Sequence, residues 1–173
     1  MSTPVFGIAG YKGAGKTTLT ERLVAELVAR GFAVSTVKHA HHSFDIDQPG
    51  RDSHRHRVAG AREVAVVSAN RWALIHELKG DPEPPLGEIL AKLAPCDLVV
   101  AEGYKREAHP KIEVRDAALG HPELAGGDPS VVAIAASGSV EDACVPVFAR
   151  DDISAIADFV IGHMGLAGTG AAP

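Results

Sequence analysis

The apolar residues of the chain occur in two patterns, short continuous runs and stripes with helical spacing. Residues 5–9 form a nearly continuous apolar run that ends in a glycine-rich stretch, which is typical of a buried parallel strand. Between 17 and 30, apolar residues recur along one helix face and charged residues occupy the other. The run at 33–37 indicates a second strand. Strand, helix and strand in close succession predict a βαβ unit.

The rest of the chain continues this alternation less regularly. A proline-rich stretch at 81–85 indicates a stiff surface linker. The other expected elements are a short helix starting at 52 or 53 and ending at 58 or 59, strands at 63–68 and 71–76 joined by a tight turn, a helix at 86–93, strands at 98–101, 111–114 and 131–135, and a final helix that is capped by Asp151 and ends near 163. This order predicts an α/β fold, with a mostly parallel sheet flanked by helices and an inserted β-hairpin.

Length and composition narrow the class of protein. The 173 residues suit one domain, which we expect at 1–164, followed by a flexible tail of small residues at 165–173. A net charge of −5 argues against binding to a nucleic-acid backbone. No apolar run is long enough to cross a membrane, and the start lacks the pattern of a secretory signal. Cys96 and Cys144 form no C-x-x-C pair. We expect a cytoplasmic protein with reduced cysteines.

The strongest chemical signal lies between the first predicted strand and helix. Residues 10–17 read G-Y-K-G-A-G-K-T and match the phosphate-loop pattern G-x-x-x-x-G-K-[ST] at every fixed position. Glycines let backbone N–H groups turn toward phosphate oxygens, and the helix start adds a positive dipole end. We expect Lys16 to reach the β- and γ-phosphates and the Thr17 hydroxyl to bind Mg²⁺. The alternative is an ordinary glycine-rich turn with an exposed lysine.

A phosphate loop also needs a carboxylate to hold the magnesium ion. Glu102 follows the predicted strand at 98–101 and is the favoured metal or water ligand. The alternative for Glu102 is a structural ion pair with Lys105 or Arg106. Asp97 begins the same strand and is expected at its opposite end, away from the loop.

The polar segment 38–53 follows the second predicted strand, so it leaves the sheet at the same edge as the loop. Its histidines at 39, 41 and 42 lack the helical spacing of a zinc site, which favours solvated or phosphate-facing roles. Asp47 or Asp52 is a candidate for orienting a magnesium-bound or attacking water. The arginines at 51, 55 and 57 add positive charge for an anionic partner.

The sequence says little about the base of a bound nucleotide. The guanine signature N-K-x-D is absent. The segments 136–138 and 151–152 are candidate loops beside a base, where a carboxylate would accept both N–H groups of guanine. Helix capping is an equally good role for Asp151.

Taken together, these segments resemble the MobB family of molybdopterin-guanine dinucleotide biosynthesis adaptors. The matching stretches are G-Y-K-G-A-G-K-T-T-L at 10–19, V-K-H-A-H-H-S-F-D-I-D-Q-P-G-R-D-S at 37–53, R-V-A-G-A at 57–61, R-W-A-L at 71–74, D-L-V-V-A-E-G-Y-K at 97–105 and P-K-I-E-V at 110–114. The resemblance implies a P-loop NTPase-like sheet, a homodimer, and binding of GTP with Mg²⁺. It also implies slow GTP hydrolysis in support of the guanylyltransferase that joins GMP to molybdopterin, with molybdopterin itself a second candidate ligand.

The resemblance also implies roles for particular residues. Asp47 and Glu102 would serve the magnesium ion, and Lys38, His39 and Arg51 would line a mouth that faces the partner. The implied phosphate-binding residues are Gly10, Tyr11, Lys12, Gly13, Ala14, Gly15, Lys16, Thr17 and Thr18. Larger relatives carry a signature lysine five positions before the phosphate-loop lysine, where this chain has Tyr11. That departure agrees with weak turnover.

Two other functions fit parts of the same pattern. A nickel-inserting GTPase metallochaperone would explain the histidines at 39–42. A small-molecule kinase would share the phosphate loop, but it needs a lid of several arginines, and none is evident between 110 and 130.

Overall fold

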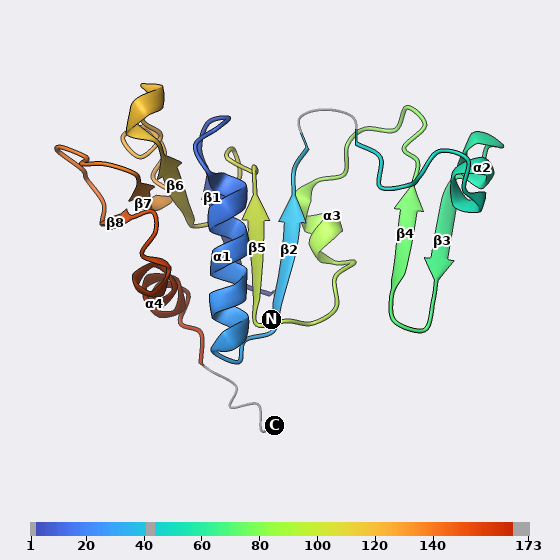
Figure 1. Ribbon diagram of the computed structural model, residues 1–173, viewed down its shortest axis with the longest axis horizontal. Coiled ribbons are helices and arrows are strands. Elements are labelled where there is room, and N and C mark those ends of the chain that lie inside the picture. The colour runs from blue at the N-terminus through green and yellow to red at the C-terminus, as the bar shows by residue number, and fades with distance from the viewer. Residues whose placement is uncertain (1–2, 41–43, 168–173) are drawn as a thin grey trace. The chain divides into compact units, whose positions relative to one another are not determined.

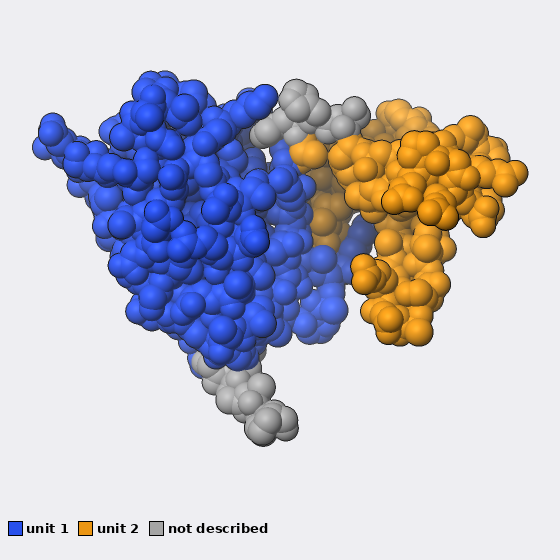
Figure 2. Space-filling view, viewed as in Figure 1, with its two compact units in different colours: residues 1–39, 92–173 blue, residues 40–91 orange. Residues whose placement is uncertain are grey.

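The computed structural model describes residues 3–40 and 44–167. The chain divides into two compact units, which Figure 2 shows in different colours. Unit 1 consists of residues 1–39 and 92–173, and unit 2 of residues 40–91. Within the expected tail, residues 168–173 lie outside the described part of the chain.

Unit 1 is built on a six-stranded sheet in which every neighbouring pair is parallel. Its strands are β1 (Val5–Ala9), β2 (Val34–Lys38), β5 (Leu98–Glu102), β6 (Lys111–Arg115), β7 (Val131–Ala136) and β8 (Val147–Ala149), in the spatial order β2-β5-β1-β6-β7-β8. This confirms the predicted parallel sheet. Because β1 connects to β2 on one side and β6 lies on its other side, the chain leaves β1 at a switch point, where open α/β sheets bind ligands.

Two helices cover one face of this sheet. Helix α1 (Lys16–Ala29) buries Leu19, Leu23 and Leu27 against strand side chains such as Phe6. These leucines belong to the predicted apolar stripe, whose last residue, Val28, is instead 54% exposed. Helix α4 (Ile153–Met164) packs beside α1 and joins the same core. Figure 1 shows α1 in front of the sheet, running alongside β5. No helix in the described ranges is both long and apolar enough to span a bilayer.

The predicted cap of the last helix is wrong by one residue. Asp152 is the N-cap of α4, and its carboxylate accepts a hydrogen bond from the backbone N–H of Ala155 at 3.1 Å. Asp151 instead forms an exposed ion pair with Arg22 of α1, at 2.5 Å. Either acid suits a cap position by type, and only the path of the backbone decides between them.

Unit 2 contains the predicted hairpin and two short helices. Strands β3 (Glu63–Val67) and β4 (Trp72–His76) pair antiparallel, and the backbone N–H of Ser68 donates to the carbonyl of Arg71 to close their turn. Helix α2 (Asp52–Val58) precedes the hairpin. Helix α3 (Leu86–Leu90) follows it and is three residues shorter than the predicted 86–93. The hairpin is the inserted one expected from the sequence, since unit 2 interrupts unit 1 between β2 and β5.

Candidate phosphate-binding site

The glycine-rich segment forms the turn that joins β1 to α1. Gly10 has a φ of +145°, and a Cβ at this position would lie 2.6 Å from the carbonyl oxygen of Val114 in β6. Gly15 has a φ of +98° and is the residue before the first turn of α1. Both positions require glycine, because a side chain is strained at these angles and would collide at Gly10. Helix α1 starts without a side-chain cap and without an acidic residue in its first turn.

The side chain of Lys16 folds back over the turn and bonds to its backbone. Its Nζ donates a hydrogen bond to the carbonyl oxygen of Tyr11 at 2.8 Å. Burial lowers the pKa of Lys16 below its ordinary value, and the nearby charges of Lys105 and Lys38 act in the same direction, whereas Glu102 opposes them. The ammonium group of Lys16 therefore lies among other charged groups at the mouth of the turn.

Glu102 lies at the carboxyl end of β5 and is only 7% exposed. It pairs in register with Lys38 of β2 and Ile8 of β1, so the three strands end together. Its Oε1 accepts a hydrogen bond from the Thr17 hydroxyl at 3.0 Å and lies 3.2 Å from the Lys38 ammonium group. The ion pair of Glu102 is thus with Lys38, not with the Lys105 or Arg106 considered from the sequence.

This pair of oxygens fits a hard divalent cation. The Lys38 Nζ also donates to the Thr17 hydroxyl oxygen at 3.4 Å, so one positive group already contacts both the hydroxyl and the carboxylate. Carboxylate and hydroxyl oxygens are ligands that Mg²⁺ accepts, usually together with waters and substrate phosphates. The structure therefore brings together Lys16, Thr17 and Glu102 as the sequence predicted, and adds Lys38 to them.

A buried lysine holds the loop that follows Glu102. Lys111, at the start of β6, is 1% exposed, and its Nζ donates to the backbone carbonyls of Lys105 and Glu107. The same Nζ contacts Asp128 at 3.2 Å and the Ser130 hydroxyl at 2.6 Å. That Lys111 holds these loops could not be predicted from the sequence, because its partners come from two separate loops.

The held loop and the segment after β6 both approach the glycine-rich turn. The Lys105 Nζ lies 5.4 Å from the centre of the Tyr11 ring. That ring stacks on His121, with ring centres 4.7 Å apart and an angle of 24°. Arg150 donates to the carbonyl of Ala14 at 3.0 Å and forms an ion pair with Asp116 at 3.2 Å. The turn is therefore fixed from both sides by contacts that sequence reasoning missed.

A cleft of about 340 Å³ opens beside the glycine-rich turn, and we call it the β6–β7 cleft. Its lining residues come from the turn, from β6 with the segment that follows, and from the segment after β7, and they are Tyr11, Ala14, Glu113, Val114, Arg115, Asp116, Ala117, Gly120, His121, Pro122, Glu123, Ala136, Gly138, Ser139, Val140 and Glu141. Of the two candidate base loops, 136–138 contributes to this cleft. Asp151 and Asp152 are engaged elsewhere, in the ion pair and the helix cap described above.

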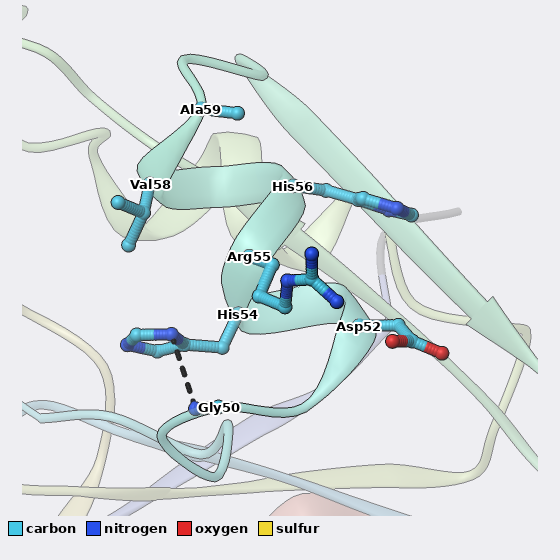
Figure 3. A pocket seen from close by; sticks show the side chains of 7 residues that line it. All are labelled: Gly50, Asp52, His54, Arg55, His56, Val58 and Ala59. Carbon is cyan, nitrogen blue, oxygen red and sulfur yellow. Dashed lines mark hydrogen bonds between the residues drawn. The ribbon is translucent and has the colours of Figure 1, made fainter.

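Unit 2 carries a shallow groove along α2 and the turn before it, drawn in Figure 3. Asp52 and Arg55 lie in this groove together with His54, whose Nδ1 accepts a hydrogen bond from the backbone N–H of Gly50. Arg51 is exposed, and its Nε donates to the side-chain oxygen of Gln48 at 3.3 Å. Asp52 therefore lies apart from the ion-pair network that holds Asp47.

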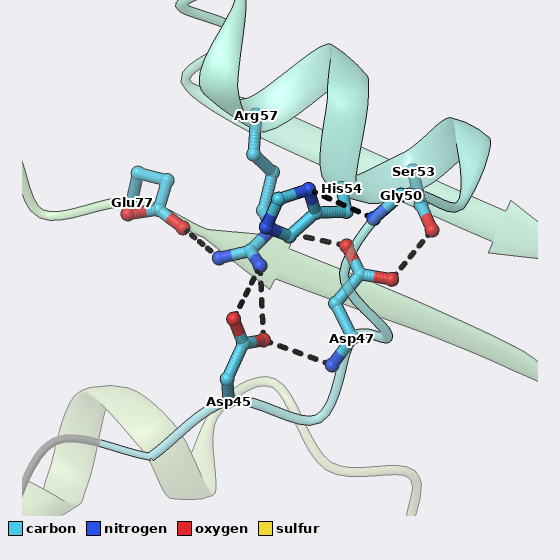
Figure 4. A network of polar contacts seen from close by, with 7 residues as sticks. All are labelled: Asp45, Asp47, Gly50, Ser53, His54, Arg57 and Glu77. Carbon is cyan, nitrogen blue, oxygen red and sulfur yellow. Dashed lines mark hydrogen bonds and ion pairs between the residues drawn. The ribbon is translucent and has the colours of Figure 1, made fainter.

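Asp47 belongs to a network centred on Arg57 (Figure 4). Arg57 forms ion pairs with Asp47 at 3.1 Å and with Asp45 and Glu77 at 2.7 Å each. The Ser53 hydroxyl donates to Asp47 at 2.6 Å, and this bond, together with Arg57, lowers the pKa of Asp47. Asp47 is thus held as an ionised carboxylate within unit 2.

The histidines of the segment 39–42 are only partly described. The backbone N–H of His39 donates to the carbonyl of Glu102, and its ring lies 5.2 Å from that of Tyr104. His41 and His42 lie outside the described residues. Within 3–40 and 44–167, no group of three or more histidine, cysteine or acidic residues is arranged to hold a metal ion.

Comparison with known proteins identifies the family. The family model "MobB: Molybdopterin guanine dinucleotide synthesis protein B" matches residues 5–137. The chain belongs to the MobB family. The molybdopterin-guanine dinucleotide biosynthesis adapter protein of Escherichia coli is 37% identical over 164 residues, which cover 93% of each chain. Its namesake in Haemophilus influenzae is 40% identical over 141 residues, covering 80% of this chain and 77% of the relative.

Solved MobB structures share this architecture. The crystal structure of a MobB homolog from Bacillus stearothermophilus superposes with a TM-score of 0.68 at 30% identity, covering 94% of this chain and 99% of that one. The crystal structure of Bacillus subtilis MobB gives a TM-score of 0.73 at 25% identity, covering 93% and 98%. The fold of this MobB chain is therefore the one found in its family.

Replacing the buried lysine tests how the loop after Glu102 is held. Lys111→Met keeps the length of the side chain but leaves Asp128 and two carbonyls without their cation. We expect the free energy of unfolding to fall by about 3 kcal/mol, as when one partner of a buried ion pair is removed. Urea unfolding measures this, with the exposed Lys92→Met as the matched control. Equal stability of the two variants contradicts the assigned role.

Proposed function

We propose that the chain is a GTP-binding accessory protein in molybdenum cofactor assembly, which assists the conversion of molybdopterin to its guanine dinucleotide form. The names of its relatives support this role in cofactor assembly. The observation that carries nucleotide binding is the meeting of the Thr17 hydroxyl and the Glu102 carboxylate near Lys16, at the exit of a glycine-rich turn.

The phosphates of the nucleotide would bind within residues 10–18. Backbone N–H groups of the turn and the uncapped start of α1 supply donors and the positive end of the helix dipole. Lys16 exchanges its bond to the Tyr11 carbonyl for a phosphate oxygen, so the carbonyl holds the ammonium group in place until the ligand arrives.

Thr17 and Glu102 are the residues that would hold Mg²⁺, and Lys38 would give way to it. The bound ion supplies positive charge to the β- and γ-phosphates. From the sequence we keep Asp47 as the candidate for orienting an attacking or metal-bound water; within unit 2 its ionised carboxylate accepts hydrogen bonds from Ser53 and Arg57. Tyr11 stands where larger relatives have a lysine, so we propose that hydrolysis is slow.

The guanylyltransferase that acts on molybdopterin is the proposed partner, in the cytoplasm. We assign Lys38 and His39 in unit 1, and separately Arg51 in unit 2, to partner-facing surfaces, where the positive charges of Lys38 and Arg51 suit an anionic nucleotide or pterin phosphate. Molybdopterin remains a second proposed ligand.

The two alternative functions gain little from the described residues. A kinase lid would need several free arginines between 110 and 130, and the arginine found there, Arg115, is paired with Glu113 and Glu123. For a metallochaperone, the described ranges offer no cluster of three metal ligands, while His41 and His42 lie outside them.

We further propose that the protein is a homodimer that pairs through its hairpin. An isolated two-stranded hairpin is marginally stable in water. On this one, Val67, Trp72 and Leu74 share one face, because Val67 lies directly opposite Trp72, and they are between 44% and 74% exposed, so apolar side chains remain uncovered along both strands. A second copy of the same hairpin would cover them.

Removing the phosphate-loop lysine tests nucleotide binding. We expect Lys16→Ala to raise the Kd for GTP with Mg²⁺ by about 100-fold, because a charge-assisted contact to phosphate is lost. Isothermal titration calorimetry measures the affinity, and Lys92→Ala is the matched control, since Lys92 is exposed and remote in sequence from the turn. Unchanged affinity in Lys16→Ala contradicts the site, and turnover of the native protein above about 1 s⁻¹ contradicts an accessory role.

The lowered pKa of Lys16 gives binding a pH dependence. A bound polyanion favours the charged ammonium form and raises this pKa again. Between the lowered pKa and the ordinary value of 10.5, binding therefore takes up a proton, and the affinity for GTP falls as the pH rises through that range. Calorimetry in two buffers of different ionisation enthalpy measures the uptake. Lys16→Arg, which stays charged, should abolish it; equal enthalpies for the native protein in both buffers would refute the coupling.

The mass of the protein in solution tests whether it is a dimer. Size-exclusion chromatography with light scattering should give twice the chain mass of 18.0 kDa. Val67→Glu places a charge on the hairpin, directly across from Trp72, and should yield the monomer. Val28→Glu introduces the same charge at an exposed apolar position of α1 and should leave the dimer intact. A native protein that elutes as a monomer at micromolar concentration speaks against hairpin pairing.

A further inference from the structure

We propose that the β6–β7 cleft recognises the 2-amino-oxopyrimidine edge that guanine and pterin share, and that the carboxylate of Glu141 is the residue that reads it. This inference rests on the proposed nucleotide-binding function, and it names the part of the ligand that the phosphate-binding residues do not contact.

The cleft is placed for a group attached to bound phosphates. Tyr11 and Ala14 belong both to its lining and to the glycine-rich turn, so the cleft and the proposed phosphate site share a wall. Its volume of about 340 Å³ lies within the range of small-molecule pockets and exceeds what a water cluster needs. A bicyclic base linked through a ribose to phosphates in the turn would extend into it.

Three of the four carboxylates that line the cleft are already engaged. Glu113 accepts hydrogen bonds from Arg115 and from two backbone N–H groups, those of Leu124 and Ala125. Asp116 accepts from Arg150 and from the backbone of Ala118. Glu123 pairs with Arg115.

Glu141 is the exception. It lines the cleft, its residue is exposed, and it makes no hydrogen bond or ion pair within the described part of the chain. An unengaged carboxylate at the rim of a pocket is an acceptor for two N–H donors side by side, since its two oxygens lie in one plane.

The free carboxylate of Glu141 complements one particular base edge. Its two oxygens accept from a ring N–H and an amino group that stand side by side, next to a carbonyl. Guanine and pterin both present that edge. Adenine presents an unprotonated ring nitrogen at the central position, which a carboxylate repels.

The remaining lining suits a flat aromatic ligand. Tyr11 and His121 form a stacked pair, and Val114, Pro122 and Val140 add apolar surface. Planar bicyclic rings bind well against such groups. They bury their apolar faces there, while their polar edge contacts the few hydrogen-bonding groups.

Replacing the carboxylate of Glu141 by an amide tests whether this residue recognises the base edge. In Glu141→Gln the side chain offers one acceptor and one donor, which matches xanthine, where a carbonyl replaces the amino group of guanine. We expect this variant to bind GTP about 10- to 100-fold more weakly and to bind XTP more tightly than the native protein does. The native protein should bind ITP, which lacks the amino group, about 10-fold more weakly than GTP. Calorimetry with GTP, ITP, XTP and ATP in the presence of Mg²⁺ gives all these values.

Asp142→Asn is the matched control. It removes the same charge from the next residue, which does not line the cleft, and asparagine tolerates the φ of +52° found there. Its preference should stay with GTP. Loss of GTP affinity in Glu141→Gln without any gain for XTP would point to a structural effect and would overturn the proposal.

Free guanosine and free 6-hydroxymethylpterin separate the two sources of the edge. Binding of either one that is lost in Glu141→Gln supports the cleft, and the tighter of the two identifies its ligand. If GTP binds to the native protein and to Glu141→Gln with equal affinity, the cleft assignment fails while the proposed nucleotide binding stands. If no triphosphate binds to the native protein, the proposed function fails. Binding of 6-hydroxymethylpterin to the native protein and to Glu141→Gln then decides whether the cleft recognises this edge.

Discussion

The candidate site depends on the shared register of three parallel strands. Because β2, β5 and β1 pair so that Lys38, Glu102 and Ile8 lie opposite one another, all three strands end at one edge of the sheet. The glycine-rich turn starts from that edge, and α1 then presents Thr17 to Glu102. A shift of one residue in the β5 register would turn Glu102 to the opposite face of the sheet and separate the hydroxyl from the carboxylate.

Strand β6 supports the loops around this edge with charge, where the neighbouring strands carry apolar side chains. Lys111 and Glu113 lie two residues apart, so they share one face of the sheet, and both are 1% exposed. Lys111 holds the loops near 105–107 and 128–130, and Glu113 holds the backbone of Leu124 and Ala125. Buried charges are tolerated when their hydrogen bonds are satisfied, and here that requirement fixes the positions of two loops, the one between β5 and β6 and the one between β6 and β7.

Much of this fold follows from local sequence patterns, and most of the contacts in the site do not. The apolar runs predicted β1, β5 and β7 because fully buried parallel strands have a continuous apolar sequence. The motif located Lys16 and Thr17, and the position of Glu102 after a strand marked it as their neighbour. The pairing of Lys38 with Glu102 depends on strand order, which the pattern leaves open. Lys111 and Arg57 act through partners in neighbouring loops and elements, and Arg150 through partners 34 and 136 residues away. The choice of Asp152 over Asp151 as a cap depends on the backbone path.

The uncapped start of α1 affects the survival of the protein as well as binding. The N-cap of α1 is Gly15, which makes a helix less stable than a Ser, Thr, Asp or Asn cap by about a few tenths of a kcal/mol, and no acidic side chain in the first turn compensates for the missing side-chain bond. Under the proposed function, an anion bound at these amides would supply the missing hydrogen-bond acceptors, and it would do so only in the folded chain. The supply of that ligand would then set the fraction of molecules that are unfolded and open to proteases, so that the abundance of the protein would follow the ligand concentration.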